Sequence, residues 1–284
     1  MFTPCLAPKD AFIQHILTII CSANQLLQAE YQTYCAADAT FKIQHKDDLS
    51  PVTQADLKCN DFILHALQQI TPEIAVLSEE GDVHLRHTWQ KCWLLDPLDG
   101  TKEFLKKRPE FTINLSLIEQ GETLFSVIAV PAQRIVYLGY TDQLPYKYLQ
   151  DQNTWQQYQA QPPLESNCLK LGLSHRSRQI EYQQFTELLA QHHSIESITA
   201  GSAYKFCLML EGEIDLYPRF HPTCEWDTSA GQGLLQSIGG GLIGLDGQKF
   251  RYNIRSSLLN SGFLAYRSEA SKSAGITALQ HMAK

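Results

Sequence analysis

The sequence has no long uninterrupted apolar run, no C-x-x-C pair and no excess of positive charge. Its most apolar early stretch, residues 12–27, is broken by polar residues such as Gln14 and Asn24, so it is too polar to span a bilayer. Lys and Arg number 23 against 30 Asp and Glu, which gives a net charge of −7. This balance argues against a general binder of nucleic acid or of membrane surfaces.

The eight cysteines are scattered, and no secretory signal pattern precedes them. We therefore expect reduced thiols in a cytoplasmic protein, with all eight cysteines acting as buried small hydrophobes. The chain has 284 residues, of which 44% are hydrophobic and 19% charged. These values are typical of a soluble globular protein with one large domain or two ordinary ones.

The most informative stretch runs from Trp93 to Thr101, where an apolar segment ends in two carboxylates, a proline and a glycine. The pattern predicts a strand buried on both faces that delivers Asp96 and Asp99 to one site. Two hard oxygen donors three residues apart suggest a cation. Thr101 opens a short helical run, whose free N–H groups could hold an anion beside that cation.

A second segment of the same kind lies upstream, where the apolar residues 74–77 lead to Glu79, Glu80 and a glycine. A surface turn is the simplest interpretation, but two neighbouring strands could also bring Glu79 and Asp96 to one ion. Helices are predicted from about Lys9 to Tyr34 and after Thr53, which could cap the second helix. Asp56 lies in that helix's first turn, where a favourable interaction with the helix dipole would alone explain it.

The later segments predict two different arrangements. Residues 111–141 alternate in the manner of hairpin-linked antiparallel strands, and the Gln-rich segment 150–163 is the best candidate boundary between halves. Beyond it, strands at 169–174 and 214–220 alternate with helices that follow Ser202 and begin near Asp227. We predict an α+β domain over residues 1–163 and an α/β domain over residues 164–284.

Four blocks in this order resemble the lithium-sensitive, magnesium-dependent phosphatases of the inositol monophosphatase superfamily, and most of all their 3′(2′),5′-bisphosphate nucleotidase branch of the CysQ type. The blocks span almost the whole chain; they are Ser50-Pro51-Val52-Thr53 with Asp56, Leu77-Ser78-Glu79-Glu80, Asp96-Pro97-Leu98-Asp99-Gly100-Thr101-Lys102-Glu103-Phe104, and Trp226-Asp227-Thr228-Ser229-Ala230-Gly231. Any one block could arise by chance, whereas four in family order make chance a poor explanation.

The resemblance implies a layered αβαβα sugar-phosphatase fold with two or three Mg²⁺ ions. One ion would be held by Glu79, Asp96 and the carbonyl of Leu98, and another by Asp96, Asp99 and Asp227. All of these donors are oxygens, which favours Mg²⁺, allows Mn²⁺ and makes zinc unlikely as the working ion. Because Mg²⁺ keeps several waters, one of them could serve as the nucleophile.

The resemblance also implies catalytic roles. Thr101, hydrogen-bonded to an ionised Asp56, would orient and deprotonate the attacking water, and Glu79 could also touch that water. We expect Glu80 to fix ligands rather than bind metal. The N–H groups of Gly100 and Thr101 would cradle the phosphate, and Asp227 would also approach the substrate.

Substrate choice is expected to depend on the second half. Ser202, Lys205 and Arg219 match positions that contact the adenosine and its second phosphate in the nucleotidase branch. Without the resemblance, the simpler interpretation of Lys205 and Arg219 is that they are solvated charges on a helix and at a strand end. Lys102 and Lys107 could assist.

The chain departs from the branch pattern in two places. Gly172-Leu173-Ser174-His175 stands where the branch often has Ser-Arg-Ser-His, and Ser229 replaces the usual alanine. The leading serine and arginine are lost in the first case, which leaves His175 to approach the base or lie on the surface. We expect the second change to be tolerated because it is small.

The expected reaction is removal of the 3′-phosphate from adenosine 3′,5′-bisphosphate, giving AMP. A further candidate substrate is 3′-phospho-5′-adenylyl sulfate, an intermediate of sulfate assimilation. The alternatives are an inositol monophosphatase and a non-catalytic sensor of a nucleotide or a cation. The expected partner is therefore a small nucleotide bisphosphate. Nothing in the sequence predicts an oligomeric state or a membrane anchor, although some relatives are peripheral to the bacterial inner membrane.

Overall fold

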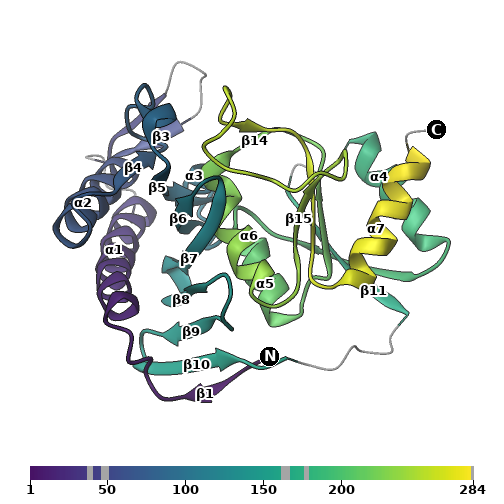
Figure 1. Cartoon of the computed structure of the whole chain (residues 1–284), viewed down its shortest axis with the longest axis horizontal. Helices are drawn as coiled ribbons and strands as arrows, with labels where there is room; N and C mark the ends of the chain where they lie inside the picture. The colour runs from purple at the N-terminus through teal and green to yellow at the C-terminus, as the bar shows by residue number, and fades with distance from the viewer. Residues whose placement is uncertain (37–40, 46–50, 161–166, 176–178, 283–284) are drawn as a thin grey trace.

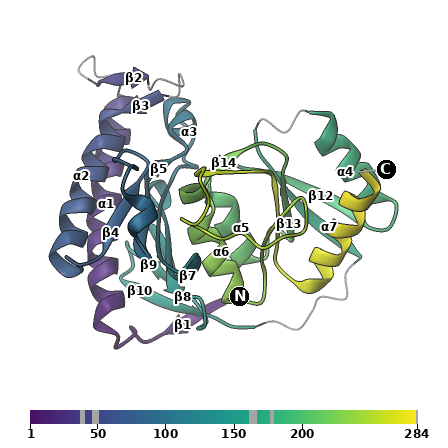
Figure 2. The same cartoon turned by 45° about the horizontal axis from the view of Figure 1, so that its top comes forward.

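Within the described residues, two large β-sheets alternate with three pairs of helices as layers (Figures 1 and 2). The computed structural model describes residues 1–36, 41–45, 51–160, 167–175 and 179–282. Helices α1 (Ala11–Cys35) and α2 (Gln54–Ile70) cover the outer face of the first sheet. Helices α5 (Tyr204–Glu211) and α6 (Ser229–Gln236) lie between the two sheets. Helices α4 (Ile180–Ala190) and α7 (Glu269–Met282) cover the second sheet. The predicted αβαβα layering is therefore confirmed.

The first sheet has eight strands and is antiparallel except where β4 runs parallel to β5. The strand order is β1 (Phe2–Cys5), β10 (Thr154–Tyr158), β9 (Tyr146–Leu149), β8 (Ile135–Tyr140), β7 (Glu122–Val130), β6 (Thr112–Glu119), β5 (Lys91–Asp99) and β4 (Ala75–Ser78). The hairpins predicted for residues 111–141 are β6, β7 and β8. Strand β5 is buried on both faces, as predicted, with Trp93 and Leu95 toward one core and Leu94 toward the other.

The outer helices of this sheet follow from local signals. Asp10 caps α1 by accepting hydrogen bonds from the N–H groups of Phe12 (2.8 Å) and Ile13 (3.4 Å). The buried stripe of α1 has the three- and four-residue spacing expected for an amphipathic helix, and it contains Ile13, Ile16, Leu17, Ile20, Ala23 and Leu27. Thr53 caps α2, as predicted, through the N–H of Ala55.

The second sheet has five strands, and it gains its parallel part from β-α-β connections. The strand order is β12 (Ser194–Thr199), β11 (Cys168–Leu173), β13 (Leu216–Arg219), β17 (Phe263–Tyr266) and β15 (Gly241–Gly244). Strand β11 is parallel to β12 and β13, whereas β17 is antiparallel to both β13 and β15.

The middle helices pack closely against the first sheet and against each other. A Cβ atom on Gly231 of α6 would lie 2.3 Å from the Phe206 ring of α5, and one on Gly233 would lie 2.1 Å from Oγ of Ser126 on β7. Any larger residue at either position would push α6 away from its neighbours. This close packing fixes the helix that follows Asp227.

The remaining elements are short. They are α3 (Thr101–Leu105), the paired strands β2 (Ile43–His45) and β3 (Pro51–Thr53), the paired strands β14 (Thr223–Cys224) and β16 (Leu259–Asn260), and the 3₁₀ turns η1 (Arg86–Thr88), η2 (Pro131–Gln133) and η3 (Glu225–Asp227). Among the helices described, none combines the length and the apolar character needed to cross a bilayer.

The Gln-rich segment 150–163, predicted as a boundary between halves, contains a strand. Residues 154–158 form β10 between β1 and β9. Trp155 and Tyr158 of β10 are buried and supply the apolar contacts, whereas the glutamines between them are partly exposed. The division into two domains near residue 163 stays a prediction.

Candidate active site

The parallel pairing of β4 and β5 brings their carboxyl ends to one edge of the first sheet. The N–H of Glu79, just after β4, donates to the carbonyl of Leu95 (3.0 Å), so Glu79 lies beside the end of β5. The pairing of β5 with β6 shifts register between Asp96 and Asp99, and the N–H of Leu98 donates to Oδ1 of Asp96 (3.1 Å). The predicted proximity of Glu79 and Asp96 is therefore confirmed.

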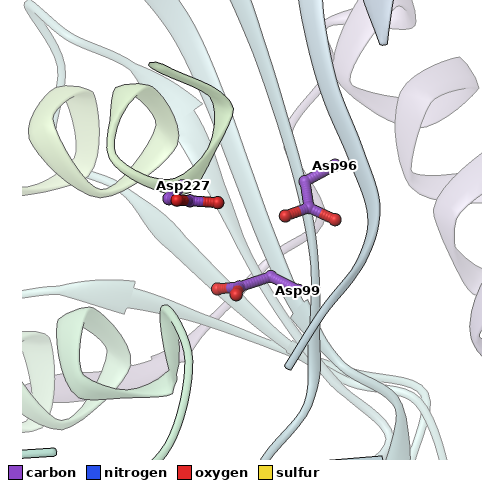
Figure 3. A group of neighbouring side chains, drawn as sticks. All are labelled: Asp96, Asp99 and Asp227. Carbon is purple, nitrogen blue, oxygen red and sulfur yellow. The ribbon is translucent and has the colours of Figure 1, made fainter. Parts of the chain in front are cut away.

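Asp227 reaches the same point from the second half of the chain. Figure 3 shows the carboxylates of Asp96, Asp99 and Asp227 around one common space, and one oxygen of each lies within 4.8 Å of the others. The N–H of Cys224 donates to Oδ2 of Asp227 (2.7 Å) and so holds the carboxylate at the end of η3. Elsewhere in the described part of the chain, no comparable cluster of His, Cys, Asp or Glu occurs.

Burial and mutual repulsion make this cluster a poor place for unneutralised charge. Burial raises the pKa of Asp96 well above its ordinary value, and the charges of Glu79 and Asp99 add to the effect. Burial, followed by Asp99 and Glu79, raises the pKa of Asp227 to about 8. Burying ionised carboxylates this close together is unfavourable unless a cation neutralises them. A bound divalent ion would remove the repulsion, so the cluster is suited to a hard cation.

Asp99 is also anchored to the second half. Its Oδ2 accepts hydrogen bonds from the N–H of Ala203 (2.6 Å) and from Nδ2 of Asn114 (3.3 Å). Asn114 lies on β6 opposite Asp96, and sequence reasoning missed it. A buried polar run, Thr112, Asn114 and Ser116, in an otherwise apolar strand was the signal that could have identified it.

Asp56 and Thr101 meet as predicted. The hydroxyl of Thr101 donates to Oδ1 of Asp56 (3.0 Å) and also lies 3.3 Å from the carbonyl of Leu98. Oδ2 of Asp56 accepts from the N–H (2.8 Å) and the hydroxyl (2.6 Å) of Thr53. Burial raises the pKa of Asp56, and these hydrogen bonds oppose the rise. The carboxylate is therefore held rigidly behind Thr101.

A cavity of about 450 Å³ lies over the carboxylates. Its lining joins the ends of β4 and β5 to the 200–205 and 219–222 segments, and it comprises Pro51, Glu79, Asp96, Leu98, Asp99, Gly100, Thr101, Lys102, Glu103, Ser174, His175, Gln179, Gly201, Ser202, Lys205, Arg219, His221, Pro222 and Asp227. All predicted metal and substrate residues line it, whereas Asp56 reaches it only through Thr101. Gly100 adopts φ +94° where the chain turns into α3, a conformation that favours glycine.

The predicted substrate residues differ in how freely they face the cavity. Lys205 is fully buried, and its ammonium donates to the carbonyls of Ala200 (2.8 Å) and Ser202 (2.9 Å). Burial, followed by the charge of Arg219, lowers the pKa of Lys205 to about 7. The hydroxyl of Ser202 lies 3.1 Å from that of Thr112 and accepts from the N–H of Tyr204 (3.3 Å), the first residue of α5. These contacts hold the loop that faces the cavity.

Other residues named from the sequence have clear positions. Lys107 donates to the carbonyl of Cys35 (3.1 Å) and does not line the cavity, so the suggestion that it assists with substrate was wrong. Nε2 of His175 lies 2.6 Å from Oε2 of Glu110, which holds the ring at the cavity wall. Ser229 is buried, and its hydroxyl pairs with that of Ser116 (2.6 Å), which explains how the chain accommodates a serine there. Ser50 lies outside the described residues.

A buried polar network supports the turn that carries Asp227. Glu225 is fully buried; its carboxylate accepts from the N–H of Asn253 (2.5 Å) and from Nη2 of Arg255 (3.0 Å). Arg86, which is buried in η1 after β4, donates to the carbonyls of Arg255 (2.9 Å) and Ser256 (2.6 Å). Glu225 is therefore a structural anion and does not line the cavity.

Comparison with known proteins gives consistent matches. The model of the inositol monophosphatase family matches residues 10–281. The 3′(2′),5′-bisphosphate nucleotidase CysQ of Salmonella typhimurium strain LT2 is 39% identical over 220 residues, which cover 77% of this chain and 86% of that protein. The crystal structure of CysQ from Bacteroides thetaiotaomicron is 30% identical, with a TM-score of 0.72, and the match covers 87% of this chain and 94% of that one. Inositol monophosphatase II from Staphylococcus aureus MSSA476 shares the fold, with a TM-score of 0.73 at 18% identity and coverage of 96% and 94%.

Proposed function

The chain belongs to the inositol monophosphatase family, and we propose that it is a phosphatase that hydrolyses the 3′-phosphate of adenosine 3′,5′-bisphosphate to give AMP and inorganic phosphate. The observation that carries this proposal is a cavity whose lining combines opposite charges. It holds the carboxylates of Asp96, Asp99 and Asp227 and also the side chain of Arg219. A small polyol phosphate needs only the carboxylates and their ions, whereas a nucleotide bisphosphate also needs positive charge for its second anion. The same cavity suits 3′-phospho-5′-adenylyl sulfate as a further substrate.

The carboxylate cluster suits Mg²⁺, because its donors, together with the carbonyl of Leu98, are all oxygens. Glu79, Asp96 and the carbonyl of Leu98 would hold one ion, and Asp96, Asp99 and Asp227 another. When bound, Mg²⁺ supplies positive charge for the phosphoryl oxygens and lowers the pKa of water.

Asp56 and Thr101 handle the proton of the attacking water. Thr101 is a poor base alone, but its hydroxyl already donates to Asp56, so its oxygen is free to accept a hydrogen bond from water. The proton then passes toward Asp56, while the water oxygen bonds to phosphorus and the bond from phosphorus to the 3′-oxygen breaks. The departing 3′-oxygen takes up a proton from solvent water and becomes the 3′-hydroxyl of AMP. Burial suits Asp56 to this role, because the raised pKa of its carboxyl makes a better base near neutral pH.

The remaining residues position the ester. Gly100 and Thr101 line the cavity, and their N–H groups would bind the phosphate oxygens. Ser202 and Arg219 would contact the nucleoside side of the substrate. Lys205, whose ammonium donates to the carbonyls of Ala200 and Ser202, fixes the loop at the cavity wall and adds positive charge there.

The two alternative functions fit less well. An inositol monophosphatase of this fold would need an acidic residue at the polyol, and Glu225, the nearest candidate in the sequence, is buried in an ionic network outside the cavity. A non-catalytic sensor has no use for a carboxylate such as Asp56, which is buried at an energetic cost and hydrogen-bonded to Thr101 at the cavity.

The choice of substrate is tested by comparing kcat/KM for adenosine 3′,5′-bisphosphate and inositol 1-phosphate. We expect a preference of at least about 100-fold for the nucleotide, because polar groups built for a second anion would stay unpaired with the polyol ester. Phosphate release measured with Mg²⁺ at several substrate concentrations gives both values. A preference for the inositol ester would overturn the proposed function.

Metal binding is tested by thermal unfolding. Mg²⁺ at roughly 100 times its dissociation constant should raise the melting temperature of the protein by about 5 °C or more relative to EDTA. In EDTA, Asp227→Asn should melt no lower than the unchanged protein, because one repelling carboxylate is gone from the buried cluster. The variant should also lose most of the response to Mg²⁺. An equal response in both proteins would contradict the assignment of Asp227 as a ligand.

A further inference from the structure

Two nitrogen atoms at one wall of the cavity lack hydrogen-bond partners among the described residues. They are Nε of Arg219 and Nε2 of His221, and both atoms are buried. Both residues line the cavity, and sequence reasoning missed His221. Buried donors are rarely left unpaired in a folded protein, so two at one wall indicate a place where a ligand supplies the acceptors.

Arg219 and His221 line the cavity on either side of Phe220 in the sequence. Arg219 is the last residue of β13, and His221 follows in a bend before Pro222. Phe220 does not line the cavity and packs on Tyr182 and Phe185, with ring centroids 4.8 Å and 5.9 Å apart. The imidazole of His221 also packs on Tyr182, with ring centroids 5.9 Å apart, and this contact helps to hold the imidazole at the wall.

The other basic groups at the cavity are already engaged or lie in solvent. The ammonium of Lys205 donates to two carbonyls, and His175 pairs with Glu110. Lys102 is an exposed residue of the cavity lining. Among the described residues that line the cavity, Arg219 and His221 therefore offer the buried donors that remain for an anion.

The two unpaired nitrogens lie in the same cavity as the carboxylates. A nucleotide with phosphates on both sides of its ribose brings a second anion into this cavity. That second phosphate would supply the acceptors that the nitrogens of Arg219 and His221 lack.

We propose that His221, together with Arg219, binds the phosphate that is not hydrolysed, and that Nε2 of His221 donates a hydrogen bond to one of its oxygens. This inference rests on the proposed nucleotidase function and identifies a residue that determines its specificity. His221 selects bisphosphates over monophosphates and takes no part in the transfer of protons at the scissile phosphate.

The test compares adenosine 3′,5′-bisphosphate with adenosine 3′-monophosphate, which has the same base and scissile ester but lacks the second phosphate. With the Mg²⁺-loaded full chain, His221→Ala should lower kcat/KM for the bisphosphate by about tenfold, mainly through KM, since one hydrogen bond to a charged group is lost. For the monophosphate the change should be below about twofold. The ratio of the two values does not depend on how much of the variant is folded.

Two further variants sharpen the result. His221→Gln keeps an N–H donor and should recover part of the preference for the bisphosphate. His84→Ala, a histidine in an exposed loop, should leave both substrates unchanged. In equilibrium binding, AMP should bind about tenfold more weakly to His221→Ala than to the unchanged protein, whereas adenosine should bind equally to both.

The outcomes separate the two proposals. If the unchanged protein hydrolyses the bisphosphate in preference to inositol 1-phosphate but His221→Ala keeps the same ratio between the two adenosine nucleotides, only the role of His221 is overturned. An equal loss on both nucleotides also overturns it, because the contact then lies on the shared part of the substrate. If the unchanged protein does not hydrolyse the bisphosphate, the proposed function fails and this inference fails with it.

Discussion

Replacement of Asp99 by asparagine should abolish Mg²⁺-dependent release of phosphate and leave the fold intact. The loss of kcat/KM should be at least about 100-fold, because removal of even an outer partner of a metal ligand costs roughly 10–100-fold. The fold should survive because an asparagine oxygen can still accept the hydrogen bond from the N–H of Ala203. Burial raises the pKa of Asp99, so a neutral side chain is also well tolerated there without metal.

Phosphate release and circular dichroism measured on the same preparation test this prediction. Asp142→Asn serves as the matched control, since it makes the same chemical change at an exposed position and should keep full activity. Calorimetric titration with Mg²⁺ adds a readout that does not depend on turnover. Activity retained by Asp99→Asn would show that Asp99 is not a ligand for an essential ion.

Asp56→Asn should lower kcat by about 100- to 10,000-fold, the usual range for loss of a general base, and change KM by less than about threefold. The reason is geometric. Asp56 does not line the cavity and reaches it only through the hydroxyl of Thr101, so substrate binding does not depend on it directly. An amide cannot accept the proton that a carboxylate takes.

Two substitutions at Thr101 complete this test. Thr101→Ser keeps the hydroxyl and should keep most of the turnover, whereas Thr101→Val should resemble Asp56→Asn. Affinity for Mg²⁺ should be nearly the same in all three variants, because none of them removes a proposed ligand. A large rise in KM with unchanged kcat would mean that Asp56 organises substrate binding and does not handle the proton.

Most of the regular structure could be predicted because local signals and packing agree. The apolar stripe of α1, the cap at Thr53 and the apolar run of β5 each specify one element, and each element appears in that form. Strand β10 could not be predicted from its glutamines. Its conformation depends on pairing with β1 and β9, which is a property of the assembled sheet rather than of the local sequence.

Some residues of the candidate site could likewise be predicted from the sequence, whereas others could not. Residues near one another in the chain, such as Asp96, Asp99 and Thr101, could be grouped because a short segment carries them. Asn114 was missed because it acts on Asp99 across a strand pairing. His221 was missed because a single histidine after a strand is uninformative until its free nitrogen is seen at a cavity wall.

The network around Glu225 has a consequence for the order in which the chain becomes competent during synthesis. Glu79, Asp96 and Asp99 are made early, but the turn that holds Asp227 acquires its ionic support only when Asn253 and Arg255 have left the ribosome. Arg86 likewise gains its hydrogen-bond acceptors, the carbonyls of Arg255 and Ser256, only when that segment has been made. A nascent chain that ends before residue 253 therefore carries every carboxylate of the site but lacks the ionic support of the turn that holds Asp227. We expect the site to become competent only after that segment has folded.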